Sequence, residues 1–129
     1  MSEELAVAHM DAMVFHDDCA FLPEWPGVPI GDEEGQIISD ALGEKRAILL
    51  AHHGQLTACK NIEEASVLAV YIERTARIQL MARAVGPIKK VAPELAREAH
   101  DFRLKKKIID ATFCYFARRV LRGGDDCLR

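Results

Sequence analysis

A short apolar stretch that ends in two histidines and a glycine is the feature that most constrains the fold of this chain. Residues 47–51 read AILLA, and His52, His53 and Gly54 follow directly. Five residues are too few for a stable helix, so we expect a buried strand with both faces covered, as in layered α/β domains. Such domains place their chemistry at strand ends, where a rigid backbone presents side chains to a crevice. Gly54 permits a turn immediately after the histidines.

Residues 1–46 predict a loop-rich part with a strand and a short helix. The apolar residues 13–15 indicate a strand that enters the sheet. Three prolines and three glycines make residues 23–35 a loop. A short amphipathic helix is expected after Asp32, with acidic residues in its first turn, and it ends at Gly43.

The rest of the chain predicts a hairpin of strands followed by helices. Residues 47–60 carry the central strands, and the second of these is expected over residues 57–59. Asn61 is a suitable N-cap for a long helix over residues 61–86, whose apolar positions recur with helical spacing. Further helices are expected over residues 93–122.

Length and composition exclude several classes of protein. A chain of 129 residues is long enough for one domain, 1–129, and too short for two. It has no apolar run of about 18 residues and no basic residue near its N-terminus, so we expect neither a membrane partner nor a signal peptide. We therefore expect a cytoplasmic protein. The four cysteines form no C-x-x-C, which favours reduced, independent thiols over disulfides or a zinc knuckle.

The charges are unevenly distributed along the chain. No lysine or arginine precedes Lys45, whereas acidic residues recur from Glu3 to Glu44. Such asymmetry can mark a nucleic-acid surface. Here the basic residues are mixed with acidic ones on predicted helices and no aromatic stacking motif accompanies them. We therefore expect no nucleic-acid partner. The uneven charge is explained either by a solvated face or by a contact between opposite charges on neighbouring subunits.

Four histidines are candidate metal ligands. Consecutive histidines at a strand end point in opposite directions, so at most one of His52 and His53 faces a given site. From the residues alone, a solvent-facing His52 and a hydrogen-bonded His53 are the simpler interpretation. His9 and His16 stand seven residues apart, which fits structural or loop roles better than ligation. A metal site built from His9, His16 and His53 is disfavoured.

Residues 49–80 carry a more specific pattern. They read LLAHHGQLTACKNIEEASVLAVYIERTARIQL: an apolar strand, His-Gly, a second strand, a lysine with an asparagine, Glu-Glu-Ala, and a helix ending in Glu-x-x-Ala-x-x-Gln-Leu. This order resembles the class II aldolase and adducin family, although His52 stands where many members have Asn. The matching positions are His52, His53, Gly54, Leu56, Thr57, Lys60, Asn61, Glu63, Glu64, Ala65, Glu73, Ala76, Gln79 and Leu80.

The resemblance implies an α/β protein with the three-layer α/β/α aldolase/adducin-type fold. This chain would represent its C-terminal half, with a few central strands and long C-terminal helices. In the aldolase branch the histidine before the glycine is one of three that hold a catalytic zinc ion, and here that position is His53. Zinc in such a site acts as a Lewis acid on an enediolate.

Other parts of the family pattern are not found. Members carry, upstream of this segment, a glycine- and serine-rich phosphate or carboxylate pocket, a catalytic acidic residue and a His-x-His pair. No His-x-His occurs in this sequence. A catalytic zinc site needs about three protein ligands, so His53 alone does not hold the metal. No catalytic residue is assigned.

Two functions follow from the resemblance. The first is a class II aldolase-like aldehyde-lyase: zinc-dependent, homo-oligomeric and tetramer-like as in the family, and acting on a small hydroxy-carbonyl compound such as a sugar phosphate or hydroxy acid. It would be incomplete as a catalyst until the missing N-terminal half is supplied. The second is a non-catalytic, adducin-like interaction module or a truncated remnant. An upstream extension encoding His-x-His would favour the first, and a true start at Met1 the second.

Overall fold

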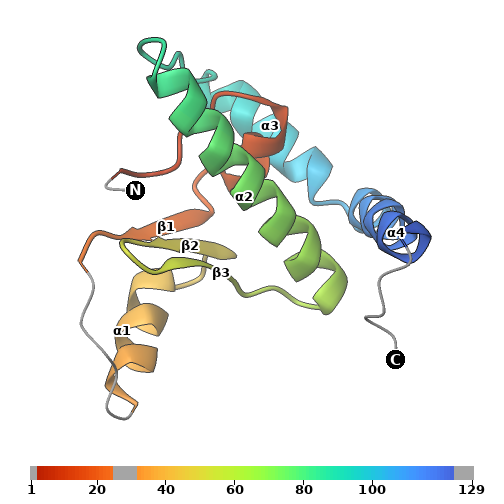
Figure 1. The fold of residues 1–129 in the computed structure, drawn as a ribbon, viewed down its shortest axis with the longest axis horizontal. Coiled ribbons are helices and arrows are strands. Elements are labelled where there is room, and N and C mark those ends of the chain that lie inside the picture. Colours follow the sequence, from red (N-terminus) through yellow and green to blue (C-terminus); the bar gives the residue numbers. More distant parts are fainter. Residues whose placement is uncertain (1–2, 25–31, 124–129) are drawn as a thin grey trace.

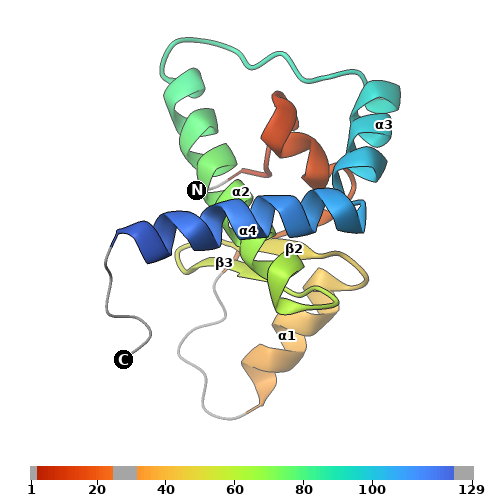
Figure 2. The same cartoon turned by 90° about the vertical axis from the view of Figure 1, so that its right-hand side faces the viewer.

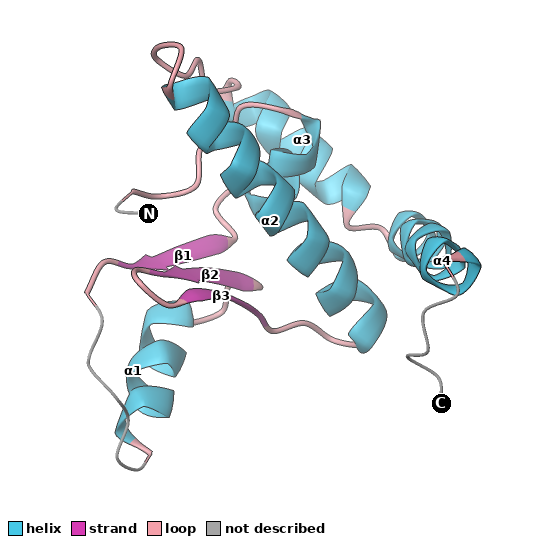
Figure 3. Ribbon diagram, viewed as in Figure 1, coloured by secondary structure: helices cyan, strands magenta, loops and turns pink. Residues whose placement is uncertain are grey.

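The structure is a computed structural model that describes residues 3–24 and 32–123. Residues 25–31 of the predicted loop at 23–35 therefore lie outside the described residues, and its last residues, 33–35, begin a helix instead. Figure 3 shows a small sheet among helices of very different lengths. The elements, in chain order, are a 3-10 helix η1 (Met10–Phe15), β1 (Cys19–Leu22), α1 (Glu33–Leu42), β2 (Ala47–Leu50), β3 (Gly54–Thr57), α2 (Ile62–Arg83), α3 (Pro93–Arg103) and α4 (Lys106–Arg122).

The three strands form one mixed sheet in the order β1-β2-β3. β1 runs parallel to β2 and places Leu22 beside Leu50, whereas β3 is antiparallel to β2 and places Gly54 beside Leu50. All four residues of β2 are buried. The prediction of a strand with both faces covered is therefore confirmed for Ala47–Leu50.

The side chains of β2 alternate between two cores. Ile48 and Leu50 pack with Ala20 against α1. Ala47 and Leu49 face the opposite side, where they join a larger core built with η1, α2 and α4. Figure 1 shows the layers, with α1 against one face of the sheet and α2 across the other. The expected three-layer α/β/α arrangement is confirmed.

Helix α2 begins as its sequence predicts and packs against both the sheet and α4. The Asn61 side chain accepts a hydrogen bond from the backbone N–H of Glu64 at 2.9 Å, which caps the first turn. Tyr71 of α2 meets Phe116 of α4 edge to face, with ring centroids 6.3 Å apart. In Figure 2, α4 crosses in front of the middle of α2. Leu80 and Met81, further along α2, are exposed.

The strand expected at residues 13–15 is wrong. These residues belong to the 3-10 helix η1, and the strand β1 begins four residues later, at Cys19. Val14 and Phe15 are buried, but they pack in the core beneath α2 rather than in the sheet. A short apolar run indicates that its residues are buried, but it does not distinguish a buried strand from a buried helical turn.

The second strand of the hairpin also differs from its predicted position. β3 spans Gly54–Thr57, so residues 58–59 lie beyond it, and the connection consists only of residues 51–53. The register with β2 decides this, because the pairing of Leu50 with Gly54 leaves no room for a longer loop. Composition around a tight turn does not reveal that register.

The C-terminal region forms two helices. Pro93 occupies the first turn of α3, as its fixed φ allows, and α4 follows after Leu104 and Lys105. Both lie within the predicted span 93–122. Among the described residues, no helix is both long and apolar enough to cross a membrane.

Candidate functional site

The two histidines lie on the tight turn that joins β2 to β3. The backbone N–H of His53 donates to the carbonyl of Leu50 at 3.2 Å, which closes the turn. The N–H of Ala51 donates to the carbonyl of Leu22 at 2.9 Å and so ties the same turn to β1. Both histidine side chains are exposed. The backbone is therefore held from both sides while the imidazoles face outward.

The turn uses two residues with positive φ. His52 has φ 62°, a left-handed conformation that Asn, Asp and His adopt more readily than other residues with a side chain. Gly54 has φ 153°, and a Cβ built there would meet no atom within 4 Å. Gly54 is thus required by the backbone conformation and not by close packing. The turn itself is made by residues 51–53, with His52 in the left-handed region, and Gly54 is the first residue of β3 rather than part of a turn after the histidines.

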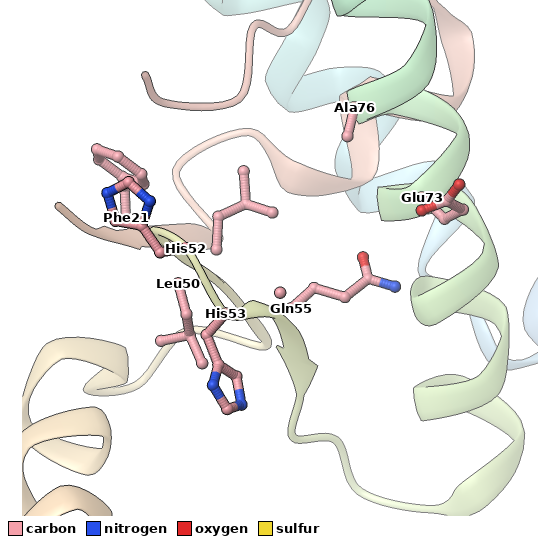
Figure 4. Close-up of a pocket in the computed structure, with 9 residues that line it drawn as sticks. Phe21, Leu50, His52, His53, Gln55, Glu73 and Ala76 are labelled. Atoms are coloured by element: carbon pink, nitrogen blue, oxygen red, sulfur yellow. The ribbon is translucent and has the colours of Figure 1, made fainter. Parts of the chain in front are cut away.

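A cavity of about 260 Å³ opens beside this turn. Figure 4 shows the rings of His52 and His53 extending in opposite directions, with His52 near Phe21, as their adjacent positions predict. Gln55 extends instead toward α2, where its Nε2 donates to the carbonyl of Ala69 at 3.1 Å. The lining residues are Phe21, Leu49, Leu50, His52, His53, Gly54, Gln55, Glu73 and Ala76.

The described residues do not form a metal site by themselves. No three His, Cys, Asp or Glu side chains in residues 3–24 and 32–123 are grouped so that they could hold a metal ion. Glu73 lines the same cavity as His53, but Figure 4 shows the His53 ring directed away from it. A zinc site with about three protein ligands therefore does not fit these residues alone. His53 offers one exposed imidazole.

His9 and His16 flank η1 and are not brought to the turn. His9 is the residue before η1, and His16 is the residue after it. The Nε2 atom of His16 lies 3.4 Å from Asp17. These two histidines and His53 do not form a ligand set within the described part of the chain.

A buried charged cluster is the main polar feature that the sequence did not reveal. We call it the Arg46 cluster; it consists of Asp18, Arg46, Glu64 and His100. Asp18 accepts hydrogen bonds from the backbone N–H of Arg46 at 2.9 Å and from its guanidinium. Arg46 Nε donates to Glu64 at 2.8 Å, and Nε2 of His100 lies 3.0 Å from Asp18. The cluster joins four elements: the start of β1, the start of β2, α2 and α3.

The Arg46 cluster stabilises the fold, and Arg46 is not available as a general acid or base. Partial burial alone would lower the pKa of Arg46, but hydrogen bonds and charge from Asp18 and Glu64 outweigh burial and raise that pKa. The guanidinium therefore stays charged at every relevant pH. Glu64 is a charged residue at a buried position of α2, which only the structure shows.

The cysteines in the described residues are free thiols, as predicted. Cys19, Cys59 and Cys114 form no disulfide, and Cys127 lies outside the described residues. Burial raises the pKa of Cys19 to about 12 and that of Cys59 to about 11. A protonated thiol is a poor nucleophile, so neither residue is a candidate for covalent catalysis at neutral pH.

The fold is an α/β domain with helices on both faces of a small sheet. Its candidate site lies at the end of the central strand, where two exposed histidines stand beside a cavity. Comparison with known proteins then gives the family. The model described as the class II aldolase and adducin N-terminal domain matches residues 1–80, and the chain belongs to this family. The residues that carry the resemblance, 49–80, lie inside this match.

Two relatives illustrate how far the similarity extends. The decarboxylase NovR of Streptomyces niveus is 28% identical over 87 residues, which cover 67% of this chain and 32% of that protein. The meiotically up-regulated gene 14 protein of Schizosaccharomyces pombe is 29% identical over 104 residues, or 78% of this chain and 40% of that protein. The chain thus spans well under half the length of these relatives.

Solved structures share the fold. The L-fuculose 1-phosphate aldolase from Glaciozyma antarctica PI12 superposes with a TM-score of 0.75 at 23% identity and covers 94% of this chain and 47% of that one. An aldolase II superfamily protein from Pseudomonas syringae has a TM-score of 0.78 at 19% identity, with 92% and 48% covered. At these identities the likeness supports the fold, and each of these proteins is about twice as long as the matched region.

Proposed function

We propose that this chain forms part of a class II aldolase-like protein and that His53 contributes one ligand to a divalent metal ion, zinc in the family pattern. The supporting observation is an exposed imidazole on a turn whose backbone is held by Leu50 and by β1. A ligand must be accessible and fixed in position before it binds a metal. The imidazole of His53 is accessible and its backbone is held in place, in a chain that belongs to this family.

The remaining ligands would come from outside one copy's described residues, either from a neighbouring copy or from additional polypeptide. This follows from the absence of a ligand group of three within residues 3–24 and 32–123. A homo-oligomer is one way to complete the site. Exposed apolar side chains near the end of α2 offer surface for such an assembly: Leu80, Met81 and Val85.

The substrate class that we propose is a small hydroxy-carbonyl compound, a sugar phosphate or a hydroxy acid. One matched structure is named as an aldolase of a sugar phosphate, and one relative is named as a decarboxylase. A cavity of about 260 Å³ beside the histidines suits a small molecule rather than a polymer. Lyase activity belongs to the completed site and not to the residues described here.

A second function is a non-catalytic, adducin-like interaction module. The observation that favours it is the same incomplete ligand set. In this alternative the histidine turn is a solvent-exposed hairpin, and the apolar surface near the end of α2 binds another protein or another copy.

Zinc content separates the two functions. The purified chain, His53→Ala and His52→Ala would be dialysed against zinc and measured for metal per chain, together with their oligomeric state. His52→Ala is the matched control because it removes the adjacent exposed imidazole. Zinc that is retained by the wild type and by His52→Ala but lost by His53→Ala would support His53 as a ligand. Equal zinc in all three would contradict ligation by His53. No retained zinc would exclude completion of the site by a second copy of this chain, so that the metal site would require additional polypeptide or the interaction module would be favoured.

A further inference from the structure

A second cavity lies at the other end of α2. It has a volume of about 270 Å³ and is enclosed by the N-terminal segment, the C-terminal half of α2 and the residues that follow this helix. Figure 1 shows the N-terminal segment passing beside that end of α2. None of its lining residues lines the cavity beside His53. Its apolar wall includes Ala6, Ile78, Ala82 and Ile88.

Two buried polar atoms in this cavity have no hydrogen-bond partner within the described residues. They are Oγ1 of Thr75 and Nε2 of His9. Thr75 is only 1% exposed, so its side chain lies within the wall of the cavity. Buried polar groups in native proteins are nearly always paired, and an unpaired one calls for an explanation. Two such atoms on residues that line one cavity are the groups that a polar ligand in it would use.

The other buried polar group of the cavity is already paired. Gln79 accepts a hydrogen bond from the backbone N–H of Ala6 at 2.7 Å through Oε1. Its Nε2 donates to the Glu3 carboxylate and to the Glu4 carbonyl, both at 3.0 Å. These bonds fix the N-terminal segment against α2 and give the cavity a firm wall. Gln79 therefore helps to form the wall of the cavity, and Thr75 and His9 are the buried polar residues left to contact a ligand.

The remaining polar groups can all donate hydrogen bonds. Thr75 has a hydroxyl proton, and Nε2 of His9 carries a proton in one neutral tautomer and in the charged form. Lys89 lines the same cavity and adds a positive charge at its exposed edge. Three donors, one of them cationic, favour a ligand whose polar end accepts hydrogen bonds and is negatively charged.

We propose that this cavity binds a small aliphatic monocarboxylate. The carboxylate would lie against Thr75, His9 and Lys89, and the alkyl group against the apolar wall. A volume of about 270 Å³ is slightly below the roughly 300–1,000 Å³ typical of ligand pockets, which limits the ligand to a short chain. The site is independent of any metal bound by His53.

The test is an amide chemical-shift titration of the full chain with butyrate, and with butyramide as the neutral ligand of matched shape. We expect saturable shifts at Thr75, Ala82 and Lys89 with butyrate, and binding of butyramide weaker by about tenfold, since a charge-assisted contact is lost. Lys89→Gln, at an exposed position, should weaken binding of butyrate but not of butyramide.

Two variants at Thr75 separate a binding role from a structural one. Thr75→Val removes the hydroxyl and keeps the shape, so binding of butyrate should weaken by about tenfold, whereas Thr75→Ser keeps the hydroxyl and should retain it. The absence of saturable shifts at the cavity would overturn the proposal. Equal affinity for butyrate and butyramide, or unchanged affinity in Thr75→Val, would overturn it as well.

Discussion

The two ends of the same buried strand carry polar groups in opposite states. Arg46, immediately before β2, is enclosed by Asp18 and Glu64 in the Arg46 cluster. His52 and His53, after β2, stand exposed on the turn. Charge at the first end is paired within the fold, and polar groups at the second end remain accessible to a ligand. The difference separates a structural use of polar residues from a candidate functional one.

The two ends are mechanically connected because β2 is short and fully buried. Its four residues pair with β1 on one side and β3 on the other. The Arg46 cluster holds the start of this strand to α2 and α3. Substitutions at the buried end should therefore change stability, and substitutions at the exposed end should change binding.

The largest effect is expected from Arg46→Met. Removal of the guanidinium leaves two largely buried carboxylates, Asp18 and Glu64, without their partner, and should lower the free energy of unfolding by about 3 kcal/mol. Urea denaturation measures this loss. Arg97→Met is the matched control, because Arg97 pairs with Asp17 at 2.7 Å on the surface, where both side chains are more than half exposed. A pair exposed to this degree contributes little to stability, because water and salt screen it. Equal losses in the two variants would contradict a structural role for the cluster.

Cys19, the residue after Asp18, should make the fold sensitive to alkaline pH. Burial raises its pKa to about 12 from the ordinary 9.0. As pH rises above about 9, the unfolded chain loses the thiol proton first, so the free energy of unfolding falls between pH 9 and 12. The expected loss is about 2 kcal/mol at about pH 11.

Cys19→Ser removes this titration and is the variant to compare. Its stability should fall less steeply than that of the wild type across the same pH range, as followed by urea denaturation at each pH. Cys114→Ser is the matched control, because Cys114 is an exposed thiol. If Cys114→Ser flattens the profile as much as Cys19→Ser, burial of Cys19 is not the cause.

The sequence predicted those parts of the fold that depend on local patterns. Residues 47–50 are a strand because they are apolar and flanked by turn-forming residues, and Asn61 caps α2 as its side-chain chemistry requires. The 3-10 helix over residues 13–15 and the start of β3 at Gly54 were not predicted. Both depend on how segments pack or pair, which a local pattern does not contain.

The candidate site was predictable in part for the same reason. The opposed directions of His52 and His53 follow from the alternation of adjacent side chains. The Arg46 cluster was missed because its hydrogen-bonded partners are separated by 18 to 82 positions, so only the tertiary fold brings them together. The unpaired atoms of His9 and Thr75 likewise could not be predicted from the sequence, because only the tertiary fold brings these two residues to the same cavity.

A moderate effect is expected at His52, where the backbone adopts φ 62°. A β-branched side chain is strained in this conformation, so His52→Val should lower the free energy of unfolding by about 1 kcal/mol. His52→Asn should leave it nearly unchanged, because Asn adopts the left-handed region readily. This fits the occurrence of Asn at this position in the family pattern. Thermal or urea unfolding of both variants checks the difference, and equal stabilities would show that the turn relaxes to another conformation.

The smallest effect on stability is expected at His53, and this is where the comparison between the two strand ends becomes decisive. His53 is exposed, and its backbone N–H, not its side chain, closes the turn. His53→Ala should therefore change the free energy of unfolding by no more than about 0.5 kcal/mol without metal.

Excess zinc should raise the stability of the wild type and of His52→Asn, but not of His53→Ala, because a ligand that binds only the folded state stabilises it. Urea denaturation of all three proteins with zinc and with a chelator provides the measurement. Such a result would make the His53 end of β2 a binding position with little role in folding. A large loss of stability in His53→Ala without metal would instead place His53 in the same structural category as Arg46, and both ends of β2 would then serve the fold.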